Sequence, residues 1–269
     1  MRVIALLATY NEERFVASCL EHLIQSGVEV FLIDNESSDG TVEIARSYLG
    51  NGLVGLEIFP RGGVYRWRPL LRRKSELAVT LDADWFLHVD ADDVRLPPST
   101  GTTLAEALLD VDSQGYNAVN FQEFTFVPTQ ESPDHDHPEF ERTMRWYYPL
   151  LPGELHQLKA WKRSDSIELA ATGGHAAHFA GRRVYPKPFP MRHYLFLSVP
   201  HAVRKFVERR YDADEVAAGL HVARAALRAE EISLQSESEL REYVSDGDLD
   251  ASSPRTNHPL FSAPAVSSG

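Results

Sequence analysis

The sequence is poor in cysteine and has no long apolar run. Its 269 residues contain one cysteine, Cys19, so no disulfide can form within the chain. A lone thiol suits a reducing cytoplasm, and Cys19 is expected to be a small core residue. No apolar run approaches the roughly 18–20 residues of a membrane-spanning helix, and the first residues lack a signal-peptide pattern. We therefore expect a cytoplasmic protein without a transmembrane segment, and leave peripheral membrane association open.

The chain also lacks an excess of positive charge. It has 27 basic and 39 acidic residues, a formal net charge of −12 at pH 7, which argues against generic nucleic-acid binding. Residues 61–74 depart from this balance, with six basic residues and no acidic one. Residues 230–250 carry eight acidic residues and a single base, Arg241. We expect the polar segment 245–269 to be disordered.

The most informative stretch is ADWFLHVDADDVRLPP, at residues 83–98. Its apolar part, residues 85–89, predicts a short buried strand. Three carboxylates follow at once, on Asp90, Asp92 and Asp93, and two prolines then prevent the strand from continuing. Neighbouring carboxylates repel one another and are costly to bury, and a cation among them relieves both effects. The stretch therefore favours a divalent metal site, with a solvated turn of capping aspartates as the alternative.

Strand-like and helix-like segments alternate through the first 90 residues. Apolar runs at 3–8, 28–33, 53–59 and 85–89 are separated by segments with helical spacing, which predicts a parallel sheet. No Gly-x-Gly-x-x-Gly follows the first run, so the dinucleotide-binding type is not indicated. Polar clusters follow the first, second and fourth runs and should meet at one edge of the sheet. We expect a mostly parallel, Rossmann-like α/β domain over 1–198, flanked by helices, and a C-terminal helical segment over 199–244. The alternating, aromatic-rich segment 116–127 predicts one further strand, and segments 199–211 and 214–229 predict two terminal helices with solvated basic faces.

Three motifs together resemble the family 2 glycosyltransferases, which have the GT-A fold. They are ATYNEE at 8–13, IDNESSDGT at 33–41 and HVDADD at 88–93, the last containing a D-x-D motif. The resemblance covers roughly residues 1–130. The segments GGH at 173–175 and RHY at 192–194 are more loosely similar to a branch with a histidine-bearing C-terminal part. The resemblance implies a GT-A-like fold and sugar transfer from a nucleotide-diphosphate sugar to an acceptor that is a glycan, a lipid or a small molecule.

The resemblance also implies roles for individual residues. Thr9, Tyr10, Asn11 and Glu12 would line the nucleoside pocket, Asp34 would contact the base, and Asp90 would face the ribose or the metal. Asp92 would bind Mn²⁺ or Mg²⁺, with His175 as a further ligand and His178 and His193 as its alternatives. Within the basic stretch, Lys74 is the first candidate for a phosphate contact, with Arg72 and Arg73 as alternatives.

The catalytic base and the stereochemistry stay open, although the resemblance favours inversion. An inverting transferase needs a base near the acceptor hydroxyl, and the acidic pair that the family usually carries downstream of the D-x-D is not evident. Glu123 is the first candidate, because its aromatic neighbours should raise its pKa by desolvation. Asp136, on a loop that could close over the acceptor, is the second.

Two other classes of function remain. A nucleotidyltransferase also uses acids, a metal and a nucleotide, but it would typically carry a glycine-rich, basic loop after the first strand, where this chain has Thr-Tyr-Asn-Glu-Glu. A non-catalytic nucleotide-sugar-binding module could keep the same fold. The presence of both Asp90 and Asp92 argues against such a module.

Overall fold

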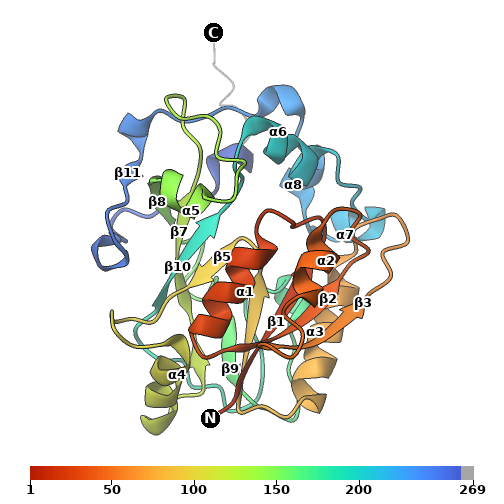
Figure 1. Cartoon of the computed structure of the whole chain (residues 1–269), viewed down its shortest axis with the longest axis vertical. Helices are drawn as coiled ribbons and strands as arrows, with labels where there is room; N and C mark the ends of the chain where they lie inside the picture. The colour runs from red at the N-terminus through yellow and green to blue at the C-terminus, as the bar shows by residue number, and fades with distance from the viewer. Residues whose placement is uncertain (262–269) are drawn as a thin grey trace.

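Parallel strands form the centre of the structure, a computed structural model that describes residues 1–261. Strands β1 (Val3–Thr9), β2 (Glu29–Asp34), β3 (Leu53–Ile58) and β4 (Trp85–Asp90) lie side by side in the order β3-β2-β1-β4 (Figure 1). All three neighbouring pairs are parallel. The expected α/β class with a mostly parallel first half is confirmed.

Antiparallel strands extend this sheet and build a second one. Strands β9 (Ala160–Lys162) and β6 (Ala118–Val119) continue the first sheet beyond β4. The second sheet has the order β11-β8-β7-β10-β5. Its strands are β5 (Asp93–Arg95), β7 (Phe121–Phe126), β8 (Trp146–Leu150), β10 (Phe189–Tyr194) and β11 (Arg241–Glu242). Only the pair of β7 and β10 is parallel in this second sheet, as far as residues 1–261 show.

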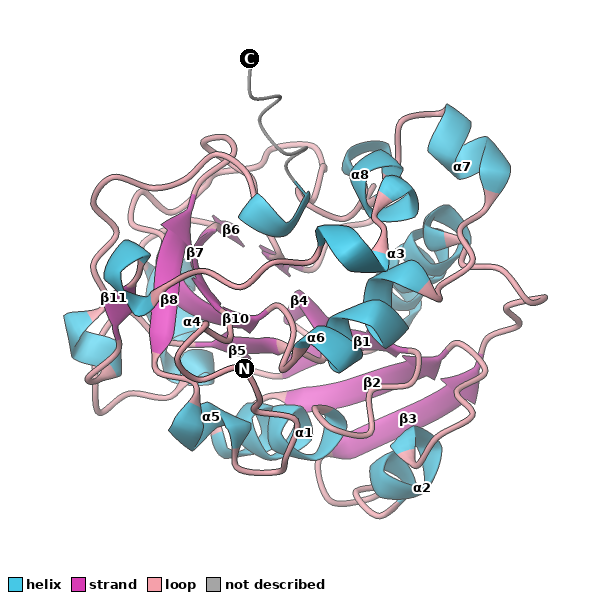
Figure 2. Cartoon of the chain, turned by 90° about the horizontal axis from the view of Figure 1, so that it is seen from above, coloured by secondary structure: helices cyan, strands magenta, loops and turns pink. Residues whose placement is uncertain are grey.

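Helices cover both faces of the first sheet. The helices before residue 150 are α1 (Val16–Gln25), α2 (Thr41–Arg46), α3 (Trp67–Thr80), α4 (Leu104–Ser113) and α5 (Phe140–Thr143). Helix α1 packs Cys19 and Leu20 into the same core as Leu7 of β1, whereas α3 packs Leu70 with Leu6. Because successive strand residues point to opposite faces, α1 and α3 lie on opposite sides of the sheet (Figure 2). Cys19 is the buried core residue that the sequence predicted.

One expected strand is divided between the two sheets. The aromatic segment 116–127 was predicted to be continuous, but β6 pairs with β9 in the first sheet and β7 pairs with β8 and β10 in the second. Asn120 lies at the crossing, where its Oδ1 accepts a hydrogen bond from the Gln157 backbone N–H and its Nδ2 donates to the Glu154 carbonyl. These hydrogen bonds of the Asn120 side chain satisfy backbone groups at the point where the strand-to-strand hydrogen bonds are interrupted.

The predicted terminal helices are shorter and more broken than expected. The two helices predicted over 199–211 and 214–229 are α6 (Val199–Ala202), a π-helical turn η2 (Val203–Val207), α7 (Ala213–Ala217) and α8 (Val222–Ala226). Asp212 caps α7, and Gly219, with a positive φ, separates α7 from α8. The remaining turns are η1 (Ala170–Thr172), η3 (Ala229–Glu231), η4 (Glu237–Glu239), η5 (Asp246–Asp248) and η6 (Pro259–Phe261).

The segment from residue 245 onwards differs from the expected disordered tail. The Asp250 backbone N–H donates to Tyr147 Oη at 2.9 Å. Arg255 exchanges backbone hydrogen bonds with Pro149 and Leu151, so this segment adds to one end of β8. Composition alone suggested disorder, but the backbone groups beside β8 offer hydrogen-bond partners that composition does not reveal. The expectation for 262–269 lies outside the described residues.

Within residues 1–261, no helix combines the length and apolar character needed to cross a bilayer.

Candidate active site

A cavity of about 940 Å³ opens where the first sheet, the second sheet and the C-terminal segment meet. Tyr10 follows β1, Asp92 follows β4, Glu123 comes from β7, and Lys205 comes from η2; all four line the cavity. The parallel register pairs Ala8 with Asp90, which brings the ends of β1 and β4 together. The polar clusters therefore meet at one edge of the sheet, as the strand order predicted.

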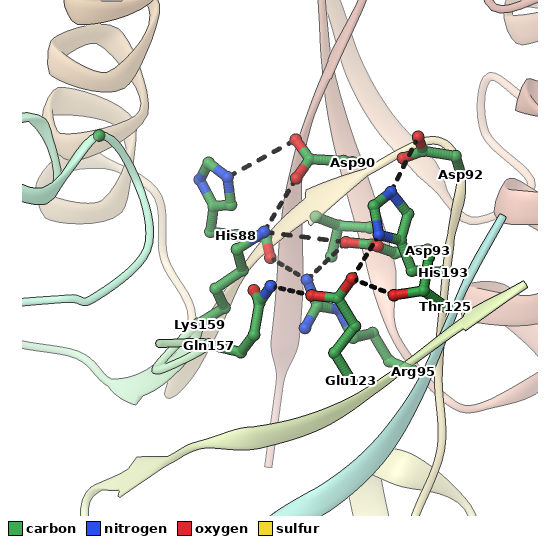
Figure 3. A network of polar contacts seen from close by, with 12 residues as sticks. His88, Asp90, Asp92, Asp93, Arg95, Glu123, Thr125, Gln157, Lys159 and His193 are labelled. Atoms are coloured by element: carbon green, nitrogen blue, oxygen red, sulfur yellow. Dashed lines mark hydrogen bonds and ion pairs between the residues drawn. The ribbon is translucent and has the colours of Figure 1, made fainter. Parts of the chain in front are cut away.

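Asp90 pairs with a lysine that the sequence analysis did not single out. Its Oδ2 lies 2.9 Å from Lys159 Nζ, and its Oδ1 lies 3.6 Å from His88 Nε2 (Figure 3). Burial by itself would raise the pKa of Asp90, but Lys159 and His88 outweigh it and hold that pKa well below the usual range. Burial lowers the pKa of His88 itself well below its usual range, so Asp90 is an anion compensated mainly by Lys159 in the cavity wall.

Asp92 is compensated in the same way from the other side. Its Oδ2 accepts a hydrogen bond from Lys205 Nζ and lies 3.4 Å from His193 Nε2. Lys205 lies 113 residues further along the chain. Burial would raise the pKa of Asp92, but Lys205 and His193 hold it well below its usual range. Each carboxylate of the D-x-D motif thus has a lysine partner.

Glu123 is almost fully buried, with both oxygens engaged. Its Oε1 accepts from Thr125 Oγ1 at 2.8 Å and from His193 Nδ1 at 2.6 Å, while Oε2 accepts from Gln157 Nε2 at 2.6 Å (Figure 3). Desolvation does act on Glu123, but His193 outweighs it, so the pKa is lowered. The expected rise in this pKa was wrong, because aromatic neighbours in the sequence do not reveal a cation across the sheet.

His193 joins these acids. Burial favours its neutral form, but Glu123 and Asp92 raise its pKa to about 10. At neutral pH the ring is therefore an imidazolium, donating from Nδ1 to Glu123 and facing Asp92 with Nε2. Strand β10 supplies this side chain, between β7 and β5 in the second sheet.

Two groups of side chains in residues 1–261 could hold a metal ion. They are Asp92 with Asp93 and His193, and Glu123 with His193 and His258; within each group the ligand atoms lie within 4.8 Å of one another. Carboxylate oxygens with an imidazole nitrogen fit a divalent ion such as Mn²⁺.

Neither His175 nor His178 belongs to these two groups. His175 lines the cavity but stacks on His156, with ring centroids 4.2 Å apart. His178 is exposed, and its Nδ1 lies 3.5 Å from Arg182.

The first turn lines the cavity only in part. Thr9, Tyr10 and Glu12 do so, and burial raises the pKa of Glu12 to about 7 against the opposing effect of Lys205. Asn11 is not among the lining residues within the described chain. It adopts φ 54°, and its Oδ1 accepts a hydrogen bond from the Ser38 backbone at 2.8 Å. The structure therefore places Asn11 where it shapes the turn rather than lines the pocket.

Asp34 and Lys74 are also absent from the described cavity wall, because both are fully buried beneath it. Asp34 accepts hydrogen bonds from Thr9 Oγ1 and from the backbone and hydroxyl of Ser37, so local groups use both of its oxygens. Lys74 Nζ donates to the Val89 carbonyl at 3.2 Å, and burial lowers its pKa to about 7. Helix α3 turns Lys74 toward β4 and away from the cavity, contrary to the expected phosphate contact.

The alternatives to Lys74 do not line the cavity either, within residues 1–261. Arg72 is exposed, and Arg73 Nε pairs with Glu57 at 2.8 Å.

Asp136 lies outside the described cavity wall as well. Its two oxygens pair with Arg14 Nε at 2.8 Å and Arg204 Nη2 at 2.6 Å. Asp136 therefore joins the segment before α1 to η2, and its position does not support the predicted role of base.

The sequence analysis overlooked the basic groups of the C-terminal segment. Lys205 and Arg209 line the cavity, although the basic residues of 199–211 were expected to be solvated. Their four-residue spacing would put them on one helical face, and this was the signal available. The sequence did not show that this face is turned inward, with the Lys205 side chain 9% exposed.

The chain belongs to glycosyl transferase family 2, because the model of that family, "Glycosyl transferase family 2", matches residues 5–169, more than half of the chain. The match confirms the resemblance suggested by the three motifs. Glycosyl transferase family 2 is a family of inverting enzymes with the GT-A fold.

The comparisons also give individual relatives. The chain is similar to the lipopolysaccharide core biosynthesis glycosyltransferase LpsC of Rhizobium meliloti (strain 1021), with 29% identity over 105 residues. The match spans 39% of this chain and 36% of LpsC. Among solved structures, S. aureus TarS 1-349 in complex with UDP matches with a TM-score of 0.46 and 15% identity, over 73% of this chain and 61% of TarS. The corresponding UDP-GlcNAc complex gives a TM-score of 0.43 and 16% identity, over 72% and 58%.

Proposed function

We propose that the protein is a metal-dependent glycosyltransferase, which transfers a sugar from a nucleotide-diphosphate sugar to an acceptor hydroxyl. The observation that carries this proposal is the placing of the D-x-D carboxylates, Asp90 and Asp92, in one cavity with the first turn and with Glu123. Family membership supports the same chemistry. The nature of the acceptor, a glycan, a lipid or a small molecule, is left open.

The donor would occupy the side of the cavity formed by the ends of β1, β2 and β4. Thr9, Tyr10 and Glu12 line this side, and Asn35 lines it in place of the neighbouring Asp34. The Asn35 Oδ1 atom is buried and has no hydrogen-bond partner in residues 1–261. Because a buried unpaired carbonyl is costly, this atom is a candidate to accept from the nucleoside. Asp34 and Asn11 would then support the turn from behind.

Asp92 would hold a divalent ion, Mn²⁺ or Mg²⁺, with Asp93 and, once its Nε2 proton is displaced, His193 as the nearest group of compatible ligands and Asp90 beside them. Such an ion supplies positive charge to the diphosphate that leaves, and stabilises the transition state by several kcal/mol. His175 belongs to neither group of compatible ligands within residues 1–261, so it would have to approach Asp92 to serve as a further ligand.

The lysines Lys159 and Lys205 would have to loosen their ion pairs with Asp90 and Asp92 when a metal binds. Released in this way, their ammonium groups remain in the cavity wall. There they would lie close to the leaving diphosphate, which gains negative charge during the transfer. Both lysines therefore suit a second role in stabilising the leaving diphosphate.

Glu123 is the candidate base on the acceptor side. It lines the cavity from β7, across from the first turn. Its low pKa keeps it anionic at neutral pH, which a base requires, although a low pKa also limits its proton affinity. His193 and Gln157 fix the carboxylate in one orientation.

The proposal is tested by nucleotide binding. A thermal-shift screen of UDP, GDP, dTDP and CDP, with and without Mn²⁺, should show one nucleotide that stabilises the protein only with the metal. A ligand at about 100 times its Kd adds roughly 2.7 kcal/mol, or about 5–10 °C for a chain of this size.

The Asp92→Asn variant should lose this metal-dependent shift, and about a hundredfold or more of any sugar transfer, while keeping its circular dichroism spectrum. A metal-dependent shift that survives in Asp92→Asn would refute the metal assignment. Release of pyrophosphate from a nucleoside triphosphate would instead indicate a nucleotidyltransferase.

A further inference from the structure

A cluster of cationic and imidazole groups lies at the end of the cavity closed by the C-terminal segment. Arg209 follows η2, and His221 and Arg224 lie at the start of α8 and within it; all three line the cavity. Arg61, which follows β3, joins them from the first sheet and is 6% exposed. We call these four residues the arginine cluster.

Aromatic rings pack against every member of the arginine cluster: Tyr10 and Tyr65 contact Arg61, Arg209 and His221, whereas Arg224 lies over Phe206 and Phe261. The Arg61 guanidinium carbon lies 3.5 Å from the centre of the Tyr10 ring, and that of Arg209 lies 4.8 Å from the Tyr65 ring and 5.7 Å from the Tyr10 ring. The His221 ring lies 5.2 Å from Tyr65. The cations are thus packed on aromatic faces and are not dispersed in solvent.

The guanidinium groups of the arginine cluster have no carboxylate partner in the part of the chain that the structure describes; the one carboxylate contact of Arg61 there is from its backbone N–H to Glu36 Oε2 at 2.9 Å. Arg61, Arg209 and Arg224 form no ion pair within 4.0 Å over residues 1–261, whereas Lys159 and Lys205 in the same cavity are both paired. Buried nitrogens in three of its members have no hydrogen-bond partner there: Arg61 Nη1, Arg209 Nε and His221 Nε2.

Unpaired charge of one sign is unfavourable inside a protein. Burial, together with the charges of Arg224 and Arg209, lowers the pKa of His221 to about 4, so its ring is neutral beside these arginines at neutral pH. His221 also adopts φ 56°, a left-handed conformation that costs a residue other than glycine of the order of 1 kcal/mol or more. The charge of Arg209 acts to lower the pKa of Glu12, but the two side chains form no ion pair among the described residues.

We infer that the arginine cluster is a binding subsite for a phosphate-bearing anion, built by the C-terminal segment and Arg61. Planar guanidinium groups present paired N–H donors that match phosphate oxygens. An anion would meet the unpaired donors and offset the mutual repulsion of the cations. The subsite is separate from the D-x-D carboxylates. It takes Arg61 from the basic stretch 61–74 but uses none of Lys74, Arg72 and Arg73, the phosphate contacts predicted from that stretch.

The position of the subsite allows two sources for the anion. Lys205, four residues before Arg209, pairs with Asp92, so the cluster lies next to the proposed metal ligands. The anion is then the diphosphate of the donor, or a phosphate on the acceptor that lies beside it. This assignment of the source rests on the proposed function, whereas the anion subsite itself does not.

Calorimetric titration with inorganic pyrophosphate, without added metal, tests the subsite. The wild-type protein should bind pyrophosphate, and the variants Arg209→Gln and Arg224→Gln should each bind it about tenfold more weakly. Arg46→Gln is the matched control, since Arg46 is exposed on α2 and does not line the cavity. Circular dichroism and Tm establish that each variant is folded.

A second titration identifies the source of the anion. The protein is first saturated with the nucleoside diphosphate and Mn²⁺ that gave the thermal shift, and pyrophosphate is then added. Loss of pyrophosphate binding assigns the subsite to the donor, and retained binding assigns it to a phosphate-bearing acceptor.

The inference is overturned if the wild-type protein does not bind pyrophosphate, or if Arg209→Gln and Arg224→Gln bind it as tightly as Arg46→Gln does. Pyrophosphate binding without any nucleotide shift would leave the subsite standing and refute the donor, so the two failures are distinguishable.

Discussion

His193 connects the two acids that matter most in the cavity. Its Nδ1 donates to Glu123 and its Nε2 faces Asp92, so one protonated ring lies between the proposed metal side and the proposed acceptor side. A change at either carboxylate alters the field at the other through this ring. Single substitutions here are therefore best judged by nucleotide affinity and turnover measured separately.

Replacing Glu123 with Gln tests its role as a base. Gln keeps the shape but cannot take a proton, so kcat should fall by about 10²–10⁴, while the Kd for the nucleotide stays within about threefold of the wild-type value. Transfer kinetics and calorimetry measure the two quantities. Asp136→Asn serves as the control and should keep kcat within about twofold, because Asp136 lies outside the described cavity wall. An equal loss of affinity and turnover in Glu123→Gln would instead indicate a structural role.

The lowered pKa of the buried Lys74 should make the stability of the fold depend on pH. Burial lowers its folded pKa from 10.5 to about 7, so between those values the unfolded chain binds the proton more tightly. The free energy of unfolding should therefore rise with pH from about 7 towards 10. Below pH 7 Lys74 is protonated in both states, so it adds no further pH dependence there. In the Lys74→Met variant the Tm should rise several degrees less between pH 7 and 9. Parallel Tm-against-pH curves for the two proteins would contradict a neutral, buried Lys74.

Among the elements, the segment after β11 differs most from what the sequence predicted. It binds β8 through Asp250 and Arg255, and its turn η6 brings Phe261 against Phe206, with ring centroids 5.2 Å apart. Phe261 also lines the cavity. This segment therefore forms part of the cavity wall and supports the π-helical turn that carries Lys205.

Removing the Phe261 side chain should weaken this wall. Phe261→Ala should cost about 1–2 kcal/mol, because the side chain is only partly buried and so loses less than a core Phe. Thermal or urea unfolding measures the change. Val244→Ala is the control, since Val244 is 69% exposed and should be neutral. An unchanged stability for Phe261→Ala would favour the disordered tail that composition suggested.

In the molecule as a whole, the cavity depends on three parts that are far apart in the sequence. The first sheet supplies the D-x-D motif, the second supplies Glu123 and His193, and the segment over 199–226 supplies Lys205 and Arg209. Helices α6 and α8 of this last segment are labelled in Figure 1. A ligand that fills this cavity should contact all three parts and stabilise them together.

This arrangement predicts a pattern of protection from amide hydrogen exchange. Under the proposed function, the nucleotide with Mn²⁺ should slow exchange in residues 9–12 and in residues 205–224, measured by mass spectrometry on the intact protein. Helix α4 is an internal reference that should not change, since none of its residues lines the described cavity. Protection limited to 9–12 would mean that the C-terminal segment takes no part in donor binding.

Local patterns in the sequence were sufficient for the first half of the fold. Apolar runs and helical spacing predicted β1 to β4 with the helices between them, and the three acids after β4 marked the edge where ligands bind. These features depend on residues close together in the chain, and a parallel sheet then follows from the short connections. The family was indicated separately, by the resemblance of three motifs to family 2 glycosyltransferases, and the match over residues 5–169 confirms it.

Tertiary structure decided which side chains face the cavity. Lys159 is 69 residues from its partner Asp90, and Lys205 is 113 residues from Asp92. No periodicity encodes such pairs, because they depend on how separate elements pack. For the same reason the sequence could not show that Lys74 is buried beneath β4, that Asp136 turns away, or that His193 lowers the pKa of Glu123. The sequence by itself determined the succession of strands and helices in the first half and the acids at the strand ends, and only the packing of the second sheet and the C-terminal segment decided the charge that surrounds them.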